Sequence, residues 1–310
     1  MIRLGIVDCD TSHVVHFSQR LHHTGVPEDQ WVDGARIVAA VPGTSRVRSA
    51  ADVARYVQIL REEQGVEIVE QPADLFGKVD AVLVESNEGA LHAKRATPFL
   101  ERGIPVFVDK PFACSCDEAW QMLNAAECGG TFVWSASSLR FAREVQDVKR
   151  RVEFGGVFAV DAFSPAHLHP RNPGLFHYGV HGVEILFALM GTGCQSVTSI
   201  CEGDVDVAVG RWEDGRLGTV RGHRRGPHVY GFTAFAERAV VPTLIDAGPL
   251  YTELLRCLVS AFQNGTAPLD SRELIEPVAF MEASLQSSLA GGVEVPIRVR
   301  GSLSGSRSAQ

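Results

Sequence analysis

The sequence predicts an α/β protein in two parts: a doubly wound parallel sheet, then an α+β domain whose open sheet is mostly antiparallel. The chain has 310 residues, more than one core usually fills. Apolar strand patterns alternate with helical patterns up to about residue 138, and beyond it strands follow one another across short turns. We therefore expect domains at 1–138 and 139–300, and a flexible tail rich in Ser and Gly at 301–310.

In the first part, short continuous apolar runs predict strands that are buried on both faces. Each run is followed by residues with helical spacing. Strands are expected at 2–7, 37–41, 79–84, 106–108 and 132–134, and helices at 12–23, 50–64, 90–101 and 117–128. Strands that alternate with helices in this way run parallel, because each right-handed crossover returns the chain to the same end of the sheet.

In the second part, alternating patterns predict strands that are neighbours in sequence. They are expected at 157–163, 197–201, 205–212, 217–222 and 229–235, with helices at 177–190, 250–263 and 272–289. The segment Glu213-Asp214-Gly215 predicts a hairpin turn between two of these strands.

Composition narrows the range of partners. Hydrophobic residues make up 45% of the chain and charged residues 21%, as in an ordinary globular protein. Lys and Arg number 29 against 37 Asp and Glu, and no long basic run offers a footprint for nucleic acid. No signal-type or membrane-spanning segment is present, so we expect a cytoplasmic protein with no membrane partner. The seven Cys lack a zinc-type pattern and are expected to be reduced and mostly buried.

The segment Asp109-Lys110-Pro111 stands at the end of the strand expected at 106–108. In an open parallel sheet, ligands bind in the crevice outside the carboxyl ends of the strands, so Lys110 would meet a ligand there. Pro111 cannot extend the strand and fixes the turn. The alternative is that Lys110 is a solvated charge at a strand end.

A second group of titratable side chains opens the helix expected at 177–190. His177 and His181 are four residues apart, so they lie on one helical face, and Glu184 continues that face. An imidazole suits a general base for a hydroxyl proton, and a nearby lysine cation would stabilise the developing alkoxide. Alternatively, the imidazoles are hydrogen-bonded core groups.

In their order and spacing, these motifs resemble the Gfo/Idh/MocA family, named after glucose-fructose oxidoreductase and inositol dehydrogenase. The resemblance covers most of the chain. The family's Glu-Lys-Pro and its Asp-x-Gly-x-His-x-x-Asp helix each have a counterpart here. The matching residues are Asn87, His92, Asp109-Lys110-Pro111, Asp117-Glu118-Ala119, Arg140-Phe141 and His177-x-Gly179-x-His181-x-x-Glu184.

The resemblance implies a Rossmann domain, a second α/β domain and NAD(P)-linked oxidation or reduction of a sugar, polyol or related carbohydrate. It implies Lys110 and His181 as the catalytic pair, with His177 beside them. Its cofactor-contacting positions would be Asp8, Asp10, Thr11, Ser12, His13, Thr44, Ser45, Arg46, Ser86, Asn87, His92, Asp109 and Lys110. It also implies a homodimer or homotetramer, joined through an apolar sheet face that carries residues such as Val207, Val209 and Trp212 or their alternates.

The chain departs from the family's pattern after the first strand. Where a dinucleotide-binding loop has three glycines, it has Asp8, Asp10 and His13. Two carboxylates facing the pyrophosphate predict weak dinucleotide binding, which replacing both by Gly would tighten. Alternatively they turn away, with Asp10 as a helix cap. The second strand ends at Pro42 rather than an acidic residue, and Thr44, Ser45 and Arg46 favour a 2′-phosphate and hence NADP.

Three functions remain open from the sequence. The first is an NAD(P)-dependent dehydrogenase. The second is a metal-assisted or other non-redox sugar-processing enzyme, with His167, His169, His177 and His181 as candidate ligands. The third is a carbohydrate-binding protein that lost the cofactor. In each case the loop at 164–176 is a candidate wall of the site, or else a plain surface connection.

Overall fold

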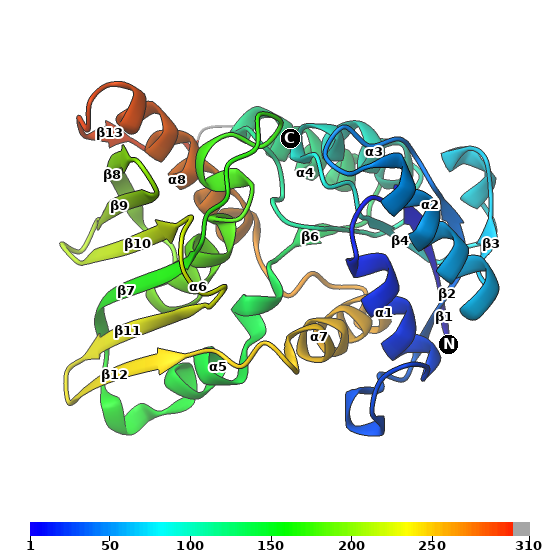
Figure 1. Cartoon of the computed structure of the whole chain (residues 1–310), viewed down its shortest axis with the longest axis horizontal. Coiled ribbons are helices and arrows are strands. Elements are labelled where there is room, and N and C mark those ends of the chain that lie inside the picture. The colour runs from blue at the N-terminus through cyan, green and yellow to red at the C-terminus, as the bar shows by residue number, and fades with distance from the viewer. Residues whose placement is uncertain (300–310) are drawn as a thin grey trace, which may run out of the picture.

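The structure, a computed structural model, describes residues 1–299, so the tail expected at 301–310 lies outside the described residues. It contains two sheets, each with its own helices (Figure 1). The first has six parallel strands in the order β3-β2-β1-β4-β5-β6, which is the Rossmann order. Its strands are β1 (Ile2–Val7), β2 (Ala35–Val41), β3 (Glu67–Ile68), β4 (Ala81–Val84), β5 (Val106–Val108) and β6 (Val133–Ser135). Its helices are α1 (His13–His22), α2 (Ala50–Gln58), α3 (His92–Leu100) and α4 (Cys116–Cys128).

The central strands of this sheet are apolar because both of their faces are covered. Every residue of β4, β5 and β6 is buried. Helices α2 and α4 begin at capping serines; at α4 the Ser115 hydroxyl accepts a hydrogen bond from the Glu118 amide at 3.2 Å. All the elements predicted in this part are present, and β3, with only two residues, was not predicted.

The second sheet has seven strands in the order β12-β11-β7-β10-β9-β8-β13. Its β7–β10 pair is parallel and its other pairs are antiparallel, so the predicted fold class is confirmed. The strands are β7 (Val157–Pro165), β8 (Cys194–Glu202), β9 (Val205–Trp212), β10 (Leu217–His223), β11 (Gly231–Ala236), β12 (Ala239–Leu244) and β13 (Val295–Pro296). The helices are α5 (Arg143–Arg150), α6 (Val180–Met190), α7 (Leu250–Asn264) and α8 (Ser271–Leu289).

Three elements of this half were missed for physical reasons. The two edge strands, β12 and β13, each contain a proline, Pro242 and Pro296, which argues against a strand unless it lies at an edge. Helix α5 is mostly polar and buries only Val145 and Val148. The hairpin turn that ends in Gly215 is present as predicted, with φ of 86° at that glycine.

The second sheet has one covered face and one open face. Helices α6 and α8 pack on the covered face, where Trp212 is buried against Phe187. The expectation that Trp212 belongs to the association face is therefore wrong. Val207 and Val209 alternate with buried residues along β9 and are partly exposed on the opposite face.

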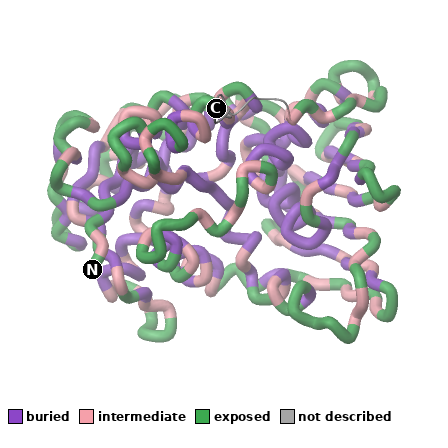
Figure 2. The backbone as a smooth tube through the Cα atoms, turned by 180° about the vertical axis from the view of Figure 1, so that it is seen from behind, coloured by how far each residue is buried: buried purple, intermediate pink, exposed green. Residues whose placement is uncertain are grey.

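Helix α7 leaves the second sheet and packs against α1 and β1 of the first (Figure 1). The Arg20 guanidinium of α1 donates a hydrogen bond to the Thr252 hydroxyl of α7 at 3.2 Å. Buried backbone runs through the interior of both halves, and the outer turns are exposed (Figure 2). Within residues 1–299, no helix has the length and apolar character needed to cross a membrane.

Candidate active site

A cavity of about 260 Å³ lies where the two parts of the chain meet. Lys110, from the end of β5, and His181, from α6, both line it, so the predicted catalytic pair shares one space. The other lining residues are Thr11, Ser12, His13, Arg48, Asn87, Ser138, Leu139, Tyr178, His228, Tyr230, Ala247, Leu250 and Tyr251. Hydroxyl, imidazole and cationic groups predominate in this lining, which suits a polar ligand.

Lys110 is held at the strand end as the sequence predicts. Its Nζ lies 3.5 Å from Asp109 Oδ2, and its side chain is 12% exposed. Burial alone would raise the pKa of Asp109, but the charges of His13 and Lys110 hold it well below its ordinary value. An ammonium group restrained in this way can stabilise negative charge that develops in the cavity.

His181 is positioned by a residue that the sequence did not single out. Its Nδ1 lies 2.7 Å from the Ser137 hydroxyl, which also accepts a hydrogen bond from the Leu139 amide. Burial lowers the pKa of His181 well below its ordinary value, and the Lys110 charge lowers it further. The ring is therefore neutral at physiological pH, the state that a proton acceptor requires.

His177 and Glu184 do not form the predicted face with His181. Helix α6 begins at Val180, so His177 precedes it and follows a short 3-10 turn, Gly174–Phe176. His177 is absent from the cavity lining, and burial lowers its pKa to about 4. Glu184 is committed to a buried ion pair with Arg140, at 2.6 Å. That pair fixes α6 to the segment after β6 and gives Arg140 of the Arg-Phe motif a structural role.

The loop after β1 has a left-handed residue, as glycine-rich loops do, but this residue and its neighbour Asp10 carry carboxylates. Asp8 has φ of 66°, in the left-handed region where glycine is usual. Its Oδ2 accepts hydrogen bonds from the Ser86 hydroxyl at 2.5 Å and from Arg95 Nε at 2.9 Å. Asp8 Oδ1 has no hydrogen-bond partner among the described residues. Any residue other than Gly at position 43 would place its Cβ 1.9 Å from that oxygen.

Asp10 bridges three loops instead of capping α1. Its carboxylate accepts hydrogen bonds from the Asn87 amide at 2.7 Å and from the Ser45 hydroxyl at 2.6 Å. Burial raises the pKa of Asp10, and both hydrogen bonds oppose that shift. The N-cap residue of α1 is Ser12, so the predicted cap role of Asp10 is wrong.

A second cavity, of about 560 Å³, lies at the carboxyl ends of β1 and β2. Its lining includes Asp8, Gly43, Thr44, Arg61 and Arg95. Two other residues that the sequence assigned to this region are already engaged. The Ser45 hydroxyl donates to Asp10, and the Arg46 guanidinium forms an ion pair with buried Glu88, with Nε 2.9 Å from Oε2.

Ser86 and His92 brace the strand ends instead of facing a cavity. His92 is fully buried, with Nε2 2.7 Å from the Ser86 carbonyl oxygen and Nδ1 2.8 Å from that of Pro111. It therefore links the loops after β4 and β5. Asn172, from the loop at 164–176, donates to the Asn87 carbonyl oxygen at 2.7 Å, which docks that loop on the site.

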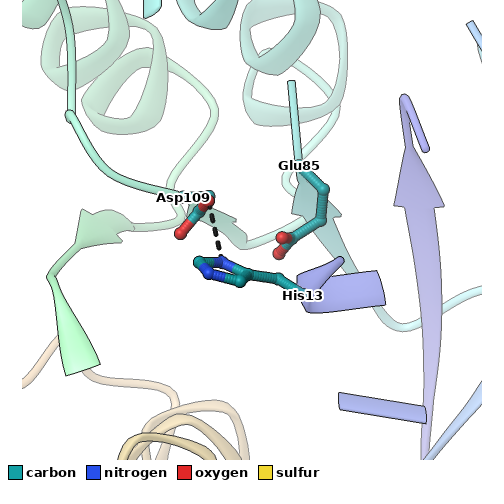
Figure 3. A group of neighbouring side chains, drawn as sticks. All are labelled: His13, Glu85 and Asp109. Carbon is teal, nitrogen blue, oxygen red and sulfur yellow. Dashed lines mark ion pairs between the residues drawn. The ribbon is translucent and has the colours of Figure 1, made fainter. Parts of the chain in front are cut away.

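A cluster that the sequence analysis did not bring together lies beside Lys110. His13, Glu85 and Asp109 point toward one another from α1 and from the ends of β4 and β5 (Figure 3). Their ligand atoms all lie within 4.8 Å of one another, and among residues 1–299 they are the one such group of three or more His, Cys, Asp or Glu residues. The histidine set proposed from the sequence, His167, His169, His177 and His181, does not form such a group.

Four aromatic residues of the cavity were also missed, because they come from segments far apart in the sequence. Tyr178, His228 and Tyr230 surround His181, and the Tyr251 ring lies 5.0 Å from that of His13. Tyr178, His228 and Tyr230 lie just before a helix or strand, and Tyr251 lies in the first turn of α7. Many residues share such positions, so the sequence carries no specific signal for them.

The first sheet thus has the Rossmann strand order, and a lysine and a neutral imidazole share one cavity at its edge. Residues 33–137 match the model of the Gfo/Idh/MocA family, described as an oxidoreductase family with an NAD-binding Rossmann fold. The resemblance predicted from the sequence is therefore confirmed by a match to this family's model over residues 33–137. The match covers the strand that carries Lys110 and excludes the loop that carries Asp8 and Asp10.

Solved structures share the whole architecture at low sequence identity. A probable dehydrogenase from Thermotoga maritima is 17% identical, with a TM-score of 0.78 over 96% of this chain and 99% of its own. A scyllo-inositol dehydrogenase from Lactobacillus casei, with bound NAD(H) and scyllo-inositol, is 14% identical, with a TM-score of 0.77 over 96% and 99%. The WlbA dehydrogenase from Bordetella pertussis, in complex with NADH and UDP-GlcNAcA, is 20% identical, with a TM-score of 0.75 over 96% and 98%. No curated protein matches the chain significantly.

Proposed function

We propose that the protein is an NAD-dependent dehydrogenase that oxidises a hydroxyl group of a small polyol or sugar, or reduces the matching ketone. The observation that carries this proposal is the shared cavity of Lys110 and His181 at the carboxyl edge of a Rossmann sheet. The polar lining, with three tyrosines and two histidines besides His181, supports a polyhydroxylated substrate. The similar structures that hold inositol or a nucleotide sugar support the same substrate class.

In this proposal His181 accepts the hydroxyl proton. Its Nδ1 then carries a hydrogen and donates it to Ser137, which leaves the Nε2 lone pair free to act as the base. The Lys110 ammonium group stabilises the alkoxide that forms. Glu184 and Arg140 act only through α6, by fixing the helix that carries His181.

The residues present fit a dinucleotide, with one change in how it is recognised. Asp8 lines the cavity beside β2, but its unpartnered Oδ1 is buried against Gly43. If the side chain turns toward the cavity, this carboxylate would accept hydrogen bonds from ribose hydroxyls and replace the acidic residue missing after β2. Thr11 and Ser12 at the start of α1 would hold the pyrophosphate, and Asn87 and Lys110 the nicotinamide end. When bound, the dinucleotide supplies the hydride acceptor. Because Asp8 is acidic and Arg46 is paired with Glu88, we propose NAD rather than NADP.

The test is a screen of polyols, aldoses and their keto forms with NAD and NADP, followed by absorbance of the reduced nicotinamide. We expect turnover with NAD and at least one polyol or sugar of a size that fits the cavity. Absence of turnover, together with absence of NADH binding by fluorescence titration, would contradict the proposal.

One observation favours a second candidate, a carbohydrate-binding protein that lost the cofactor. The hydrogen bonds from Ser45 and Asn87 to Asp10 cross the sheet edge between the two cavities, near the path of a bound dinucleotide. Saturable binding of a sugar without any binding of NADH would support this candidate over the dehydrogenase.

A further inference from the structure

Glu85, the first residue after β4, has a fully buried carboxyl group. Neither of its oxygens has a hydrogen-bond partner among the described residues. Burying a carboxyl group without a donor is costly unless the group stays protonated or a positive charge lies beside it. Its side chain is aimed at His13 and Asp109 (Figure 3), so any such charge would lie between these three residues.

The other two members of the cluster face each other. His13 Nδ1 and Asp109 Oδ2 form an ion pair at 3.0 Å (Figure 3), and neither atom has a hydrogen-bond partner of good geometry in residues 1–299. A metal ion would replace the proton that this pair shares. One nitrogen and two carboxylate oxygens thus converge within 4.8 Å. A metal ion bound at about 2.0–2.2 Å from each would hold these atoms within roughly 4 Å of one another, so only a small closure is needed.

We propose that His13, Glu85 and Asp109 form a binding site for one divalent transition-metal ion of the Zn²⁺ or Mn²⁺ kind. An imidazole with two carboxylates is a donor set that such ions accept and that Mg²⁺ or Ca²⁺, which prefer oxygen ligands alone, favours less. The ion would neutralise the two buried carboxylates. The proposal does not depend on dinucleotide binding or on dehydrogenase activity.

The frame around the cluster is suited to hold a metal. Glu85 and Asp109 leave adjacent parallel strands, and His92 links the loops that follow by contacting the carbonyl oxygens of Ser86 and Pro111. His13 lines the cavity of about 260 Å³, so an ion has a path to the site and open coordination positions would face the cavity. The Lys110 ammonium group, 3.5 Å from Asp109, opposes the binding of a cation.

The experiment is a titration of metal-stripped protein with Zn²⁺, and separately with Mn²⁺, by calorimetry without dinucleotide or substrate. We expect one equivalent to bind the wild-type protein. Glu85→Gln and Asp109→Asn should each weaken binding at least about tenfold to a hundredfold, because each removes a ligand charge. Lys110→Met should strengthen binding, because it removes the opposing cation.

Glu88→Gln is the matched control, since Glu88 is another buried carboxylate after β4 but pairs with Arg46 outside the cluster. It should bind Zn²⁺ as the wild type does. Thermal unfolding guards against misfolded variants. Zn²⁺ should raise the Tm of the wild type and of Glu88→Gln equally, and should raise that of folded Glu85→Gln less at the same concentration. The proposal is overturned if the wild type binds no stoichiometric ion, or if folded Glu85→Gln binds as tightly as the wild type.

Discussion

The two sheets contribute to the site in different ways. The first is buried on both faces, and its functional groups, such as Asp8 and Lys110, stand on loops at one edge, directly after the strands. The second is covered on one face only, and it contributes His181 through α6, a helix packed on that face. The first sheet therefore forms one wall of the cavity, and the second places the His181 imidazole beside it.

The largest expected effect comes from replacing the proposed catalytic pair one residue at a time, because Lys110 belongs to the first sheet and His181 to a helix of the second. Lys110→Met and His181→Asn should each lower turnover by roughly a hundredfold or more, because each removes charge stabilisation or proton transfer. His177→Asp should be tolerated better, since His177 lies outside the cavity lining. Steady-state kinetics measures the turnover of all three variants, and circular dichroism checks that each one is folded. Wild-type turnover in either of the first two variants would remove that residue from the mechanism.

The same contrast explains how much could be predicted from the sequence. Doubly buried strands such as β4 and β5 leave continuous apolar runs, so the first sheet and the position of Lys110 were predictable. The bonding of Asp10 was not, because its partners Ser45 and Asn87 are 35 and 77 residues away. No local pattern reports which loops meet at a sheet edge.

Glu85 and Ser137 were missed for a related reason. Each looks like an ordinary polar residue at the end of a strand or turn, and only the assembled structure aims Glu85 at His13 and Ser137 at His181. Sequence spacing did find His181, but it placed His177 inside the helix that in fact begins at Val180.

A second prediction tests whether Asp8 recognises the ribose. Asp8→Asn should weaken NADH binding by about tenfold, because a charged acceptor is replaced by a neutral one, and should reduce discrimination against NADPH. Asp10→Asn is the matched control: its carboxylate is already satisfied by Ser45 and Asn87, so removing its charge should leave binding unchanged or slightly tighter. Fluorescence titration with both cofactors measures this, and equal effects of the two substitutions would refute the distinction between these aspartates.

A third prediction concerns the open face of the second sheet. We expect a homodimer or homotetramer joined through this face, because apolar side chains left in water there favour association. Its partly or fully exposed apolar residues include Val207, Val209, Ile200, Leu217 and Val240. Light scattering should give a multiple of the monomer mass, and Val207→Glu with Val209→Glu should shift it toward the monomer. A monomeric wild type at working concentration would contradict this expectation.

The smallest expected effect is a shift in the pH dependence of kcat/KM for alcohol oxidation. The neutral form of His181 accepts the proton, and burial with the Lys110 charge lowers its pKa, so the neutral form persists below the ordinary value of 6.5. Activity should therefore fall only as the pH drops through that lowered pKa, with the acid limb below pH 6.5. In Lys110→Met one cause of the shift is gone, so the acid limb of the residual activity should move to higher pH. His177→Asp, away from the cavity lining, should leave the limb much closer to its wild-type position. A wild-type limb at or above 6.5, or one that Lys110→Met does not move, would show that His181 beside Lys110 is not the group that titrates.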